Sequence, residues 1–261
     1  MPPISSIVDC LPAWLQDLRG RALDLVFPPT CLACEADLSN VTWQQLGGMF
    51  CESCRESLIL LEEPICPRCA SRVPEVHGVR LDCGVCQKQA LRIDRTVAVG
   101  PYDGLLRDLI LRMKTDTRRL LAHNLVDLAW RACGAQLRDL KVDAIATVPT
   151  HPLRQLQRGV SVPHALAGAL ARKLKVPVAS RLLKRKSNTP AQAGLSRPAR
   201  IKNVRGEILV RQGHVGSLGH VLLVDDVLTT GATADETARV LKRAGIGKVS
   251  AFVMGRTLDM G

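Results

Sequence analysis

The sequence lacks an apolar stretch long enough to cross a bilayer, and it has few aromatic side chains. A membrane-spanning helix takes about 20 mostly apolar residues, and no apolar run approaches that length here. The N-terminal segment has no basic start, and Asp9, Asp17 and Arg19 interrupt its apolar positions, unlike a secretory signal peptide. Aromatics make up 3% of the chain, which disfavours platforms on which nucleic-acid bases stack. We therefore expect a cytoplasmic protein with no membrane insertion.

Positive charge and apolar residues are, in contrast, plentiful. The 261 residues carry a formal net charge of +12, and 46% of them are hydrophobic. This composition is typical of a globular protein with one large core, or a medium core and a small added module. The excess of Lys and Arg favours an anionic partner such as nucleic acid, pyrophosphate or a phosphorylated sugar. Residues 1–30 are predicted to form an amphipathic helix with an apolar face of Leu11, Trp14, Leu15, Leu18 and Ala22.

Eight of the ten cysteines form four C-x2-C pairs. Each pair presents two thiolates at the spacing of one edge of a tetrahedral zinc site. The 16 residues 35–50 separate the first two pairs and the 13 residues 70–82 separate the last two, close to the spacing of four-cysteine zinc sites. Pairing in sequence order predicts two closed, structural zinc sites in a double ribbon, residues 31–86. The ligands would be Cys31, Cys34, Cys51 and Cys54 in the first site, and Cys66, Cys69, Cys83 and Cys86 in the second.

Other arrangements of these thiols are compatible with the sequence. A cross-braced pairing would join the first pair with the third and the second with the fourth, and an iron–sulfur cluster is a further competitor. Disulfides are disfavoured because cytoplasmic thiols are kept reduced. Cys10 and Cys133 fall outside the pattern and are expected to be ordinary buried thiols. In function, the ribbons are expected either to dock a partner or to contact nucleic acid.

Residues 87–261 alternate between predicted strands and helices. Strands are expected at 94–100, 143–149, 220–227 and 248–256, and helices at 103–114, 118–138, 159–175 and 234–245. Such alternation predicts an α/β domain with a parallel sheet flanked by helices. Ligands of these domains bind at the carboxyl ends of the strands.

The stretch VLLVDDVLTTGAT, residues 221–233, joins one of these strands to a helix. Its hydroxyl-rich turn with Gly231 opens a helix, an arrangement in which backbone amides and threonine hydroxyls converge on a phosphate. The adjacent carboxylates of Asp225 and Asp226 repel an anion but suit ribose hydroxyls or a hydrated Mg²⁺ ion. A site with both features is expected to bind a phosphorylated sugar.

This stretch resembles, along its whole length, the signature of type I phosphoribosyltransferases, which bind phosphoribosyl pyrophosphate. Together with the four cysteine pairs, it makes residues 27–258 similar to the ComF/GntX family of competence-associated proteins. The resemblance implies a type I phosphoribosyltransferase-like parallel sheet flanked by helices, behind an N-terminal double zinc ribbon. It also implies a role in DNA uptake, with a competence helicase or DNA-processing proteins as partners.

The resemblance also implies roles for single residues. Asp225 and Asp226, as the catalytic pair, would hold the ribose 2′- and 3′-hydroxyls directly or through Mg²⁺. The residues that would cradle the 5′-phosphate are Thr229, Thr230, Gly231, Ala232 and Thr233. The segment VPTHPLRQLQRG resembles the pyrophosphate loop, with contacts expected from Thr150, Arg154 and Arg158. One feature departs from the family: Gly159 is followed by Val-Ser-Val instead of Phe-Asn-Gln, so the acceptor contacts of those side chains are missing.

A basic segment precedes the signature. Between residues 184 and 211, eight Lys and Arg side chains and one Glu give a charge of +7, more than half of the total. The segment resembles the loop that closes over pyrophosphate in the family, and its charge also suits phosphodiesters. Two functions therefore stay open: phosphoribosyl transfer to a nitrogen nucleophile, or binding of single-stranded DNA or a partner protein by a module that keeps a sensory or vestigial sugar-phosphate site.

Overall fold

The computed structural model describes residues 28–39, 49–58, 61, 64–76, 79–80, 82–88, 91–115, 119–149, 161–186 and 204–257. The chain divides into two compact units, Met1–Glu56 and Ser57–Gly261. The predicted double-ribbon module is thereby split, with one group of four cysteines in each unit; the domain boundaries drawn from the sequence stay a prediction. The predicted N-terminal helix lies outside the described residues. No helix in the described ranges is both long and apolar enough to cross a membrane.

The first unit is a small cysteine-rich fold. Its described part begins with an isolated antiparallel β-bridge between Thr30 and Asp37 and ends with the short helix α4, Glu52–Glu56. The tight turn after Cys31 is closed by its amide, which donates to the Ala36 carbonyl at 2.8 Å. Among the described residues of this unit, the buried apolar side chains besides cysteine are Pro29, Leu38 and Phe50.

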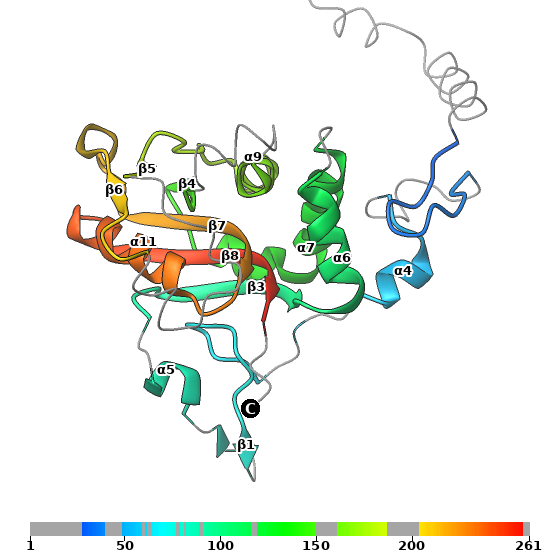
Figure 1. Cartoon of the computed structure of the whole chain (residues 1–261), viewed down its shortest axis with the longest axis horizontal. Coiled ribbons are helices and arrows are strands. Elements are labelled where there is room, and N and C mark those ends of the chain that lie inside the picture. Colours follow the sequence, from blue (N-terminus) through cyan, green and yellow to red (C-terminus); the bar gives the residue numbers. More distant parts are fainter. Residues whose placement is uncertain are drawn as a thin grey trace, which may run out of the picture. The chain divides into compact units, whose positions relative to one another are not determined.

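The second unit contains a parallel four-stranded sheet in the order β3-β8-β7-β4 (Figure 1). Its strands are β3 (Arg95–Pro101), β4 (Ala144–Thr147), β7 (His220–Leu228) and β8 (Lys248–Arg256). All three pairings are parallel, as predicted for strands separated by helical crossovers. The two central strands are rich in apolar residues, and five of the nine residues of β7 and eight of the nine of β8 are buried, as expected where both faces of a sheet are covered.

Helices connect the strands and cover the sheet. They are α6 (Gly104–Met113), α7 (Leu120–Asp139), α9 (Val162–Leu174) and α11 (Ala232–Arg243). Helix α11 contributes Ala234, Ala238 and Leu241 to a core that it shares with alternate residues of β7 and β8. Because successive side chains of a strand point to opposite faces, the intervening residues face away from α11, and α6, α7 and α9 pack against the strands as well. All predicted strands and helices of the α/β domain are present.

Smaller elements complete the second unit. The second ribbon contains the hairpin of β1 (Glu75–Val76) and β2 (Val79–Arg80), followed by α5 (Gly84–Lys88). A second antiparallel hairpin pairs β5 (Leu183–Arg185) with β6 (Ile208–Val210), and the short helix η1 (Gln212–His214) follows it. Cys69, Ala70 and Val73 of the ribbon lie in the same core as α11, so this ribbon is part of the α/β unit.

Candidate functional site

The paired carboxylates lie where the sheet narrows. Strand β4 pairs with β7 only as far as Thr147 opposite Val224, whereas β7 and β8 stay paired up to Leu228 and Arg256. Asp225 and Asp226 are therefore the first residues of β7 without β4 beside them. This is the carboxyl end of a parallel sheet, where ligands of such folds bind. The two aspartates thus lie in the last four residues of β7, next to the turn that leads into α11.

The electrostatics of this pair call for a positive partner. Burial raises the pKa of Asp225 well above its ordinary value, and the adjacent charge of Asp226 raises it further. The Asp225 carboxylate accepts a hydrogen bond from the Asp226 amide at 2.9 Å, and Asp226 accepts one from the Val227 amide at 2.9 Å. Two backbone donors do not neutralise two carboxylates, so a cation at this point would be strongly favoured.

The cation that the structure provides is Lys114, a residue that sequence reasoning missed. It follows the last turn of α6, and its Nζ lies 3.3 Å from Asp226 Oδ2. Both side chains are largely buried, with exposed fractions of 29% and 20%. In the sequence, Lys114 looks like an ordinary lysine at a helix end, where it suits the helix dipole. The search for a counter-ion to the aspartates would have had to span 112 residues, and only the fold makes this pairing visible.

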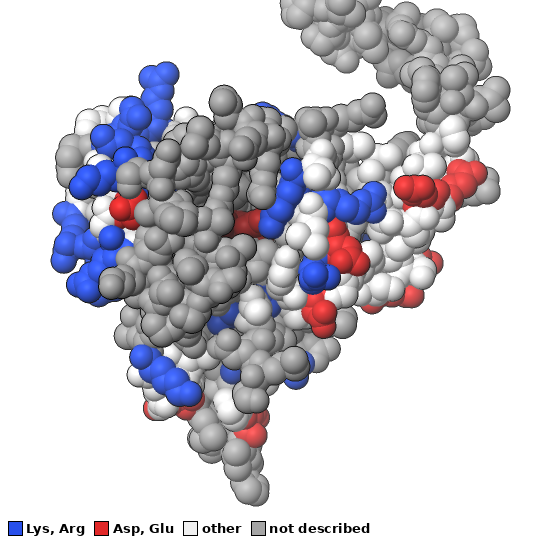
Figure 2. Space-filling model, in the orientation of Figure 1, with Lys and Arg blue, Asp and Glu red and all other residues white. Residues whose placement is uncertain are grey.

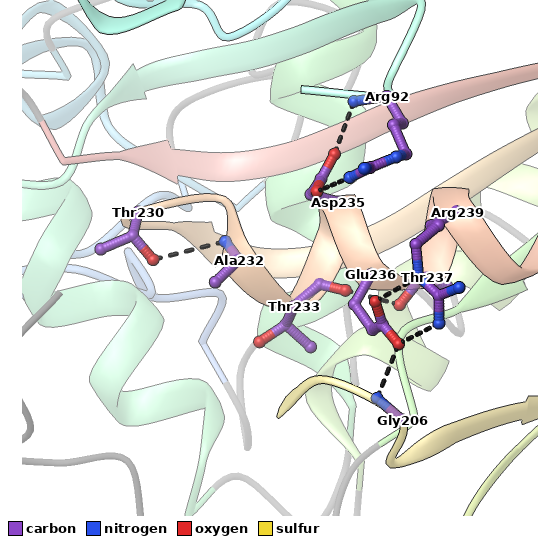
Figure 3. A network of polar contacts seen from close by, with 9 residues as sticks. All are labelled: Arg92, Gly206, Thr230, Ala232, Thr233, Asp235, Glu236, Thr237 and Arg239. Atoms are coloured by element: carbon purple, nitrogen blue, oxygen red, sulfur yellow. Dashed lines mark hydrogen bonds and ion pairs between the residues drawn. The ribbon is translucent and has the colours of Figure 1, made fainter. Parts of the chain in front are cut away.

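The predicted phosphate turn forms the start of α11. Gly231 precedes the helix with φ of 76°, and the hydroxyl of Thr230 accepts from the Ala232 amide at 3.3 Å (Figure 3). A side chain at Gly231 would be strained by this left-handed conformation. A β-carbon there would also meet the Leu91 side chain at 3.2 Å. The glycine is thus needed for the shape of the turn and for its packing against Leu91, in addition to any close approach of a phosphate.

Two acidic residues fasten the first turns of α11 to neighbouring segments. Asp235 accepts from the Arg92 amide at 2.5 Å and from its guanidinium at 2.8 Å. Glu236 accepts from the Gly206 amide at 2.8 Å and pairs with Arg239 at 2.6 Å (Figure 3). Burial alone would raise the pKa of Glu236, but the bonds from Arg239 and Gly206 lower it. The helix that carries the turn is therefore held on one side by residue 92 and on the other by the flank of β6.

The basic segment is described in part. Lys184 and Lys186 lie exposed on or next to β5, and Arg205 and Arg211 flank β6. Figure 2 shows Lys and Arg side chains gathered on this side of the molecule, around the β5–β6 hairpin and α11. Arg185, the last residue of β5, is half-buried. The cations Arg197, Arg200 and Lys202, and the predicted pyrophosphate contacts Thr150, Arg154 and Arg158, lie outside the described residues.

The eight cysteines form two clusters, each with four thiols. Cys31, Cys34, Cys51 and Cys54 make one and Cys66, Cys69, Cys83 and Cys86 the other, and within each cluster all four sulfurs lie within 4.8 Å of one another. Three sulfur–sulfur distances are 3.7 Å for Cys34–Cys51, 3.8 Å for Cys66–Cys86 and 3.5 Å for Cys69–Cys83. These are edges of tetrahedral sites and are too long for disulfides. Sequential pairing is confirmed, and the cross-braced alternative is excluded.

The thiols behave as a set that needs a cation. In the first cluster, burial opposes ionisation of Cys31, but hydrogen bonds from the amides of Cys34, Cys51 and Ala33 lower its pKa to about 6. Burial and the neighbouring sulfurs then raise the pKa of Cys54. The second cluster repeats this pattern, with the pKa of Cys69 lowered and that of Cys86 raised. One thiolate forms readily and the rest are held back by mutual repulsion, which a bound Zn²⁺ relieves.

The donor set therefore fits structural zinc. Four thiolates leave no open coordination position, and amide donors such as those to Cys31 stabilise sulfur ligands. When bound, the two zinc ions supply folding free energy to their ribbons rather than chemistry. Cys133, outside the clusters, is buried in α7, and burial raises its pKa to about 12, as predicted for an ordinary thiol.

The fold and these sites define the class of protein: an α/β phosphoribosyltransferase-type domain combined with a double zinc ribbon. Family models agree, because a double zinc ribbon domain matches residues 22–91 and a phosphoribosyl transferase domain matches residues 164–255. The second match contains both aspartates and the phosphate turn.

Similar proteins that match nearly the whole length of the chain identify the family within this class. The chain is 29% identical to competence protein F of Haemophilus influenzae, over 87% of this chain and 96% of that one. It is 30% identical to the DNA utilization protein YhgH of Escherichia coli K12, over 90% and 100%. It is 26% identical to competence protein ComFC of Bacillus subtilis, over 87% and 95%. The chain belongs to the ComF/GntX family.

Proposed function

We propose that the protein binds phosphoribosyl pyrophosphate together with Mg²⁺ at the carboxyl end of its sheet and that it takes part in the uptake or use of DNA. The observation that carries the first half is the combination of a carboxylate pair and a hydroxyl-rich helix start within one strand–turn–helix segment, with the half-buried Lys114 of α6 paired to one of the carboxylates. The printed names of the relatives, competence protein and DNA utilization protein, support the second half.

Each part of the site suits one part of this ligand. The helix start at Gly231 offers amides and the hydroxyls of Thr229, Thr230 and Thr233 to a 5′-phosphate. Asp225 and Asp226 offer oxygens to ribose hydroxyls or to a hydrated Mg²⁺ ion, which when bound would neutralise part of the pyrophosphate charge. Pyrophosphate itself would contact Thr150, Arg154 and Arg158. These assignments follow the family resemblance residue by residue.

Lys114 adds a contact that the family resemblance did not assign. Without ligand, its ammonium group neutralises Asp226 at 3.3 Å. Mg²⁺ or ribose hydroxyls at the same carboxylate would compete with that ion pair, which would free the ammonium group for a neighbouring anionic oxygen of the ligand. In the ligand-free protein, Lys114 thereby reduces the electrostatic repulsion between the two carboxylates, and the ion pair breaks only when Mg²⁺ or the sugar binds Asp226.

Paired asparagine substitutions test the ligand assignment. Asp225→Asn with Asp226→Asn should weaken Mg²⁺-dependent binding of phosphoribosyl pyrophosphate by at least on the order of 10²-fold, since each of the two charged contacts is worth roughly 1.5–3 kcal/mol. Calorimetric titration with and without Mg²⁺ measures this. Asp127→Asn, which removes an exposed carboxylate paired with Lys173 on the far helices, is the matched control. Unchanged affinity of the double variant would show that the aspartates contact neither sugar nor metal.

Release of pyrophosphate separates binding from catalysis. The protein would be incubated with phosphoribosyl pyrophosphate, Mg²⁺ and a panel of bases, ammonia and amides. Pyrophosphate formed in the presence of one acceptor, and not by the double asparagine variant, would establish a transferase. Tight binding with no release would favour a sensory or vestigial site.

The exposed cations of the β5–β6 hairpin favour a second function, the binding of single-stranded DNA. We expect this binding to weaken steeply with salt and to show little sequence preference, because few aromatic side chains are available for stacking. Lys184→Ala with Lys186→Ala should lower the slope of log K against log salt by about 1.4, at roughly 0.7 per phosphate contact. The matched control is Lys141→Ala with Lys248→Ala, two exposed lysines next to the amino ends of β4 and β8. Equal slopes for the two double variants would contradict this second function.

A further inference from the structure

A buried arginine connects the second zinc cluster with the phosphate turn. Arg256, the last residue of β8, is 2% exposed. Its Nε donates to the Cys69 carbonyl at 2.8 Å, and its Nη2 donates to Ser71 Oγ at 2.8 Å. Its Nη1 donates to the carbonyls of Leu228 at 3.0 Å, Thr229 at 2.7 Å, and Thr257. One side chain thus bridges the zinc ribbon and the start of the turn.

The contacts on the ribbon side reach a zinc ligand. Ser71 accepts from Arg256, and its hydroxyl and amide donate to the sulfur of Cys69. The path from guanidinium to metal therefore contains one hydroxyl and one sulfur. Such outer-shell partners hold metal ligands in place and tune their affinity.

The contacts on the turn side set the direction of backbone amides. In a planar trans peptide, the carbonyl and the amide of the next residue point in opposite directions. Because Arg256 holds the carbonyls of Leu228 and Thr229, the amides of Thr229 and Thr230 point away from it. The phosphate-binding face of the turn is thereby oriented before any ligand arrives, which lowers the cost of binding.

The charge of Arg256 also needs a balancing partner. Within the described residues, Arg256 donates five hydrogen bonds, and all five acceptors are backbone carbonyls or a hydroxyl and none is a carboxylate. A buried, unpaired charge is costly. A zinc ion with four thiolates carries a net double negative charge, and the Cys69 ligand lies next to the guanidinium. With zinc bound, the second cluster would supply negative charge close to this guanidinium.

We propose that Arg256 is a positioning residue that couples the second zinc cluster to the phosphate turn, so that zinc binding and phosphate binding strengthen each other. This inference rests on the phosphate site proposed above. Two further contacts point the same way: Leu91, just after the ribbon, packs against Gly231, and Arg92 holds Asp235 of α11. Coupling between two sites is reciprocal by thermodynamic necessity, and this reciprocity provides the test.

The first experiment needs no sugar phosphate. The protein with both zinc ions is compared with Arg256→Met, Arg256→Lys and the exposed control Arg243→Met. We expect Arg256→Met to release one of its two zinc ions to a chelating dye about 10-fold faster or more, and the peptide 228–232 to exchange its amides faster, in line with typical coupling energies. Arg256→Lys keeps the charge and should restore part of both effects. Zinc release and exchange at wild-type rates in Arg256→Met would overturn the proposal.

The second experiment uses unsubstituted Arg256 and therefore does not depend on whether its variants fold. Phosphoribosyl pyrophosphate with Mg²⁺ is added to Cys34→Ser, which is expected to retain only the second zinc ion, and the affinity for zinc is measured by competition with a chelating dye. We expect this affinity to rise about 5- to 150-fold, the usual range of coupling between sites. If calorimetry shows binding but the zinc affinity does not change, the coupling is refuted. If calorimetry shows no binding, the proposed ligand is wrong, and the first experiment alone decides the coupling.

Discussion

The two cysteine clusters have the same ligands and nearly the same spacing, but their surroundings differ. The first belongs to a small unit in which Pro29, Leu38 and Phe50 are the buried apolar partners among the described residues. The second shares its core with the central strands and with α11, and Cys69 is fully buried there. One motif thus forms most of a small core in one unit and a part of a large core in the other.

The difference shows how far the influence of each metal extends. A small ribbon has too little apolar material to fold without zinc, so loss of the first zinc should unfold that ribbon alone. Loss of the second zinc would disrupt the packing of the ribbon against the α/β core and loosen the contacts that position the phosphate turn. The first ribbon is thus suited to contacts outside the unit that carries the site, and the second to the support of the site itself.

The largest expected effect comes from removing one ligand from each cluster. Cys83→Ser should lose one zinc ion and at least about 4 kcal/mol of the stability of the α/β unit, a fraction of the 10–16 kcal/mol typical of structural zinc. For a unit of this size, that loss corresponds to about 8–16 °C in the main melting transition. Cys51→Ser should also lose one zinc ion but leave that transition in place. Calorimetry with elemental analysis measures both.

Equal melting shifts for the two serine variants would show that the clusters do not differ in this way. Iron in place of zinc in the purified protein, or absence of metal, would overturn the assignment of both sites.

A second pair of variants changes packing and leaves every thiol in place. Leu91, 5% exposed, touches Gly231, and Phe50 is fully buried in the first unit. Leu91→Ala should destabilise the α/β unit by about 3 kcal/mol, the usual cost of a buried Leu→Ala cavity. Phe50→Ala should instead speed the release of zinc from the first cluster without moving the main transition. Thermal melting and zinc release distinguish the two, and the comparison fails if both variants act on the main transition.

The sequence was sufficient to predict the strands and helices of the α/β domain and the cysteine clusters. The four C-x2-C spacings predicted both clusters, and the alternating strands and helices predicted the parallel sheet, because these patterns depend on neighbours in the chain. The turn at Gly231 was also recognisable, since a glycine before a helix start combines a local conformation with local donors.

The sequence did not reveal the residues that reach the site from a distance. Lys114 and Arg256 each look like ordinary basic side chains at the end of an element, and their roles follow from contacts with Asp226 and with Cys69. The packing of the second ribbon against the sheet has no signal in the sequence for the same reason. It depends on the packing of Cys69 and Val73 against strands more than 100 residues away, for which periodicity gives no signal.

The smallest expected effect concerns a single carboxylate in each unit. Asp235, 8% exposed, accepts two hydrogen bonds from Arg92, whose side chain is 54% exposed. In Asp235→Asn the amide oxygen can still accept from the Arg92 backbone, but its NH₂ group would face the guanidinium, and one charge-assisted bond is lost. Solvent screening on the arginine side limits the cost to about 1–2 kcal/mol, or about 2–8 °C in the main transition.

Asp37→Asn is the counterpart in the first unit, where Asp37 accepts hydrogen bonds from the amide and hydroxyl of Ser39. This variant should leave the main transition in place. Thermal melting at neutral pH compares the two. If Asp235→Asn has the same main melting temperature as Asp37→Asn and the wild type, the contact between Arg92 and α11 does not support the phosphate turn. The coupling between zinc and ligand would then depend on Arg256 alone.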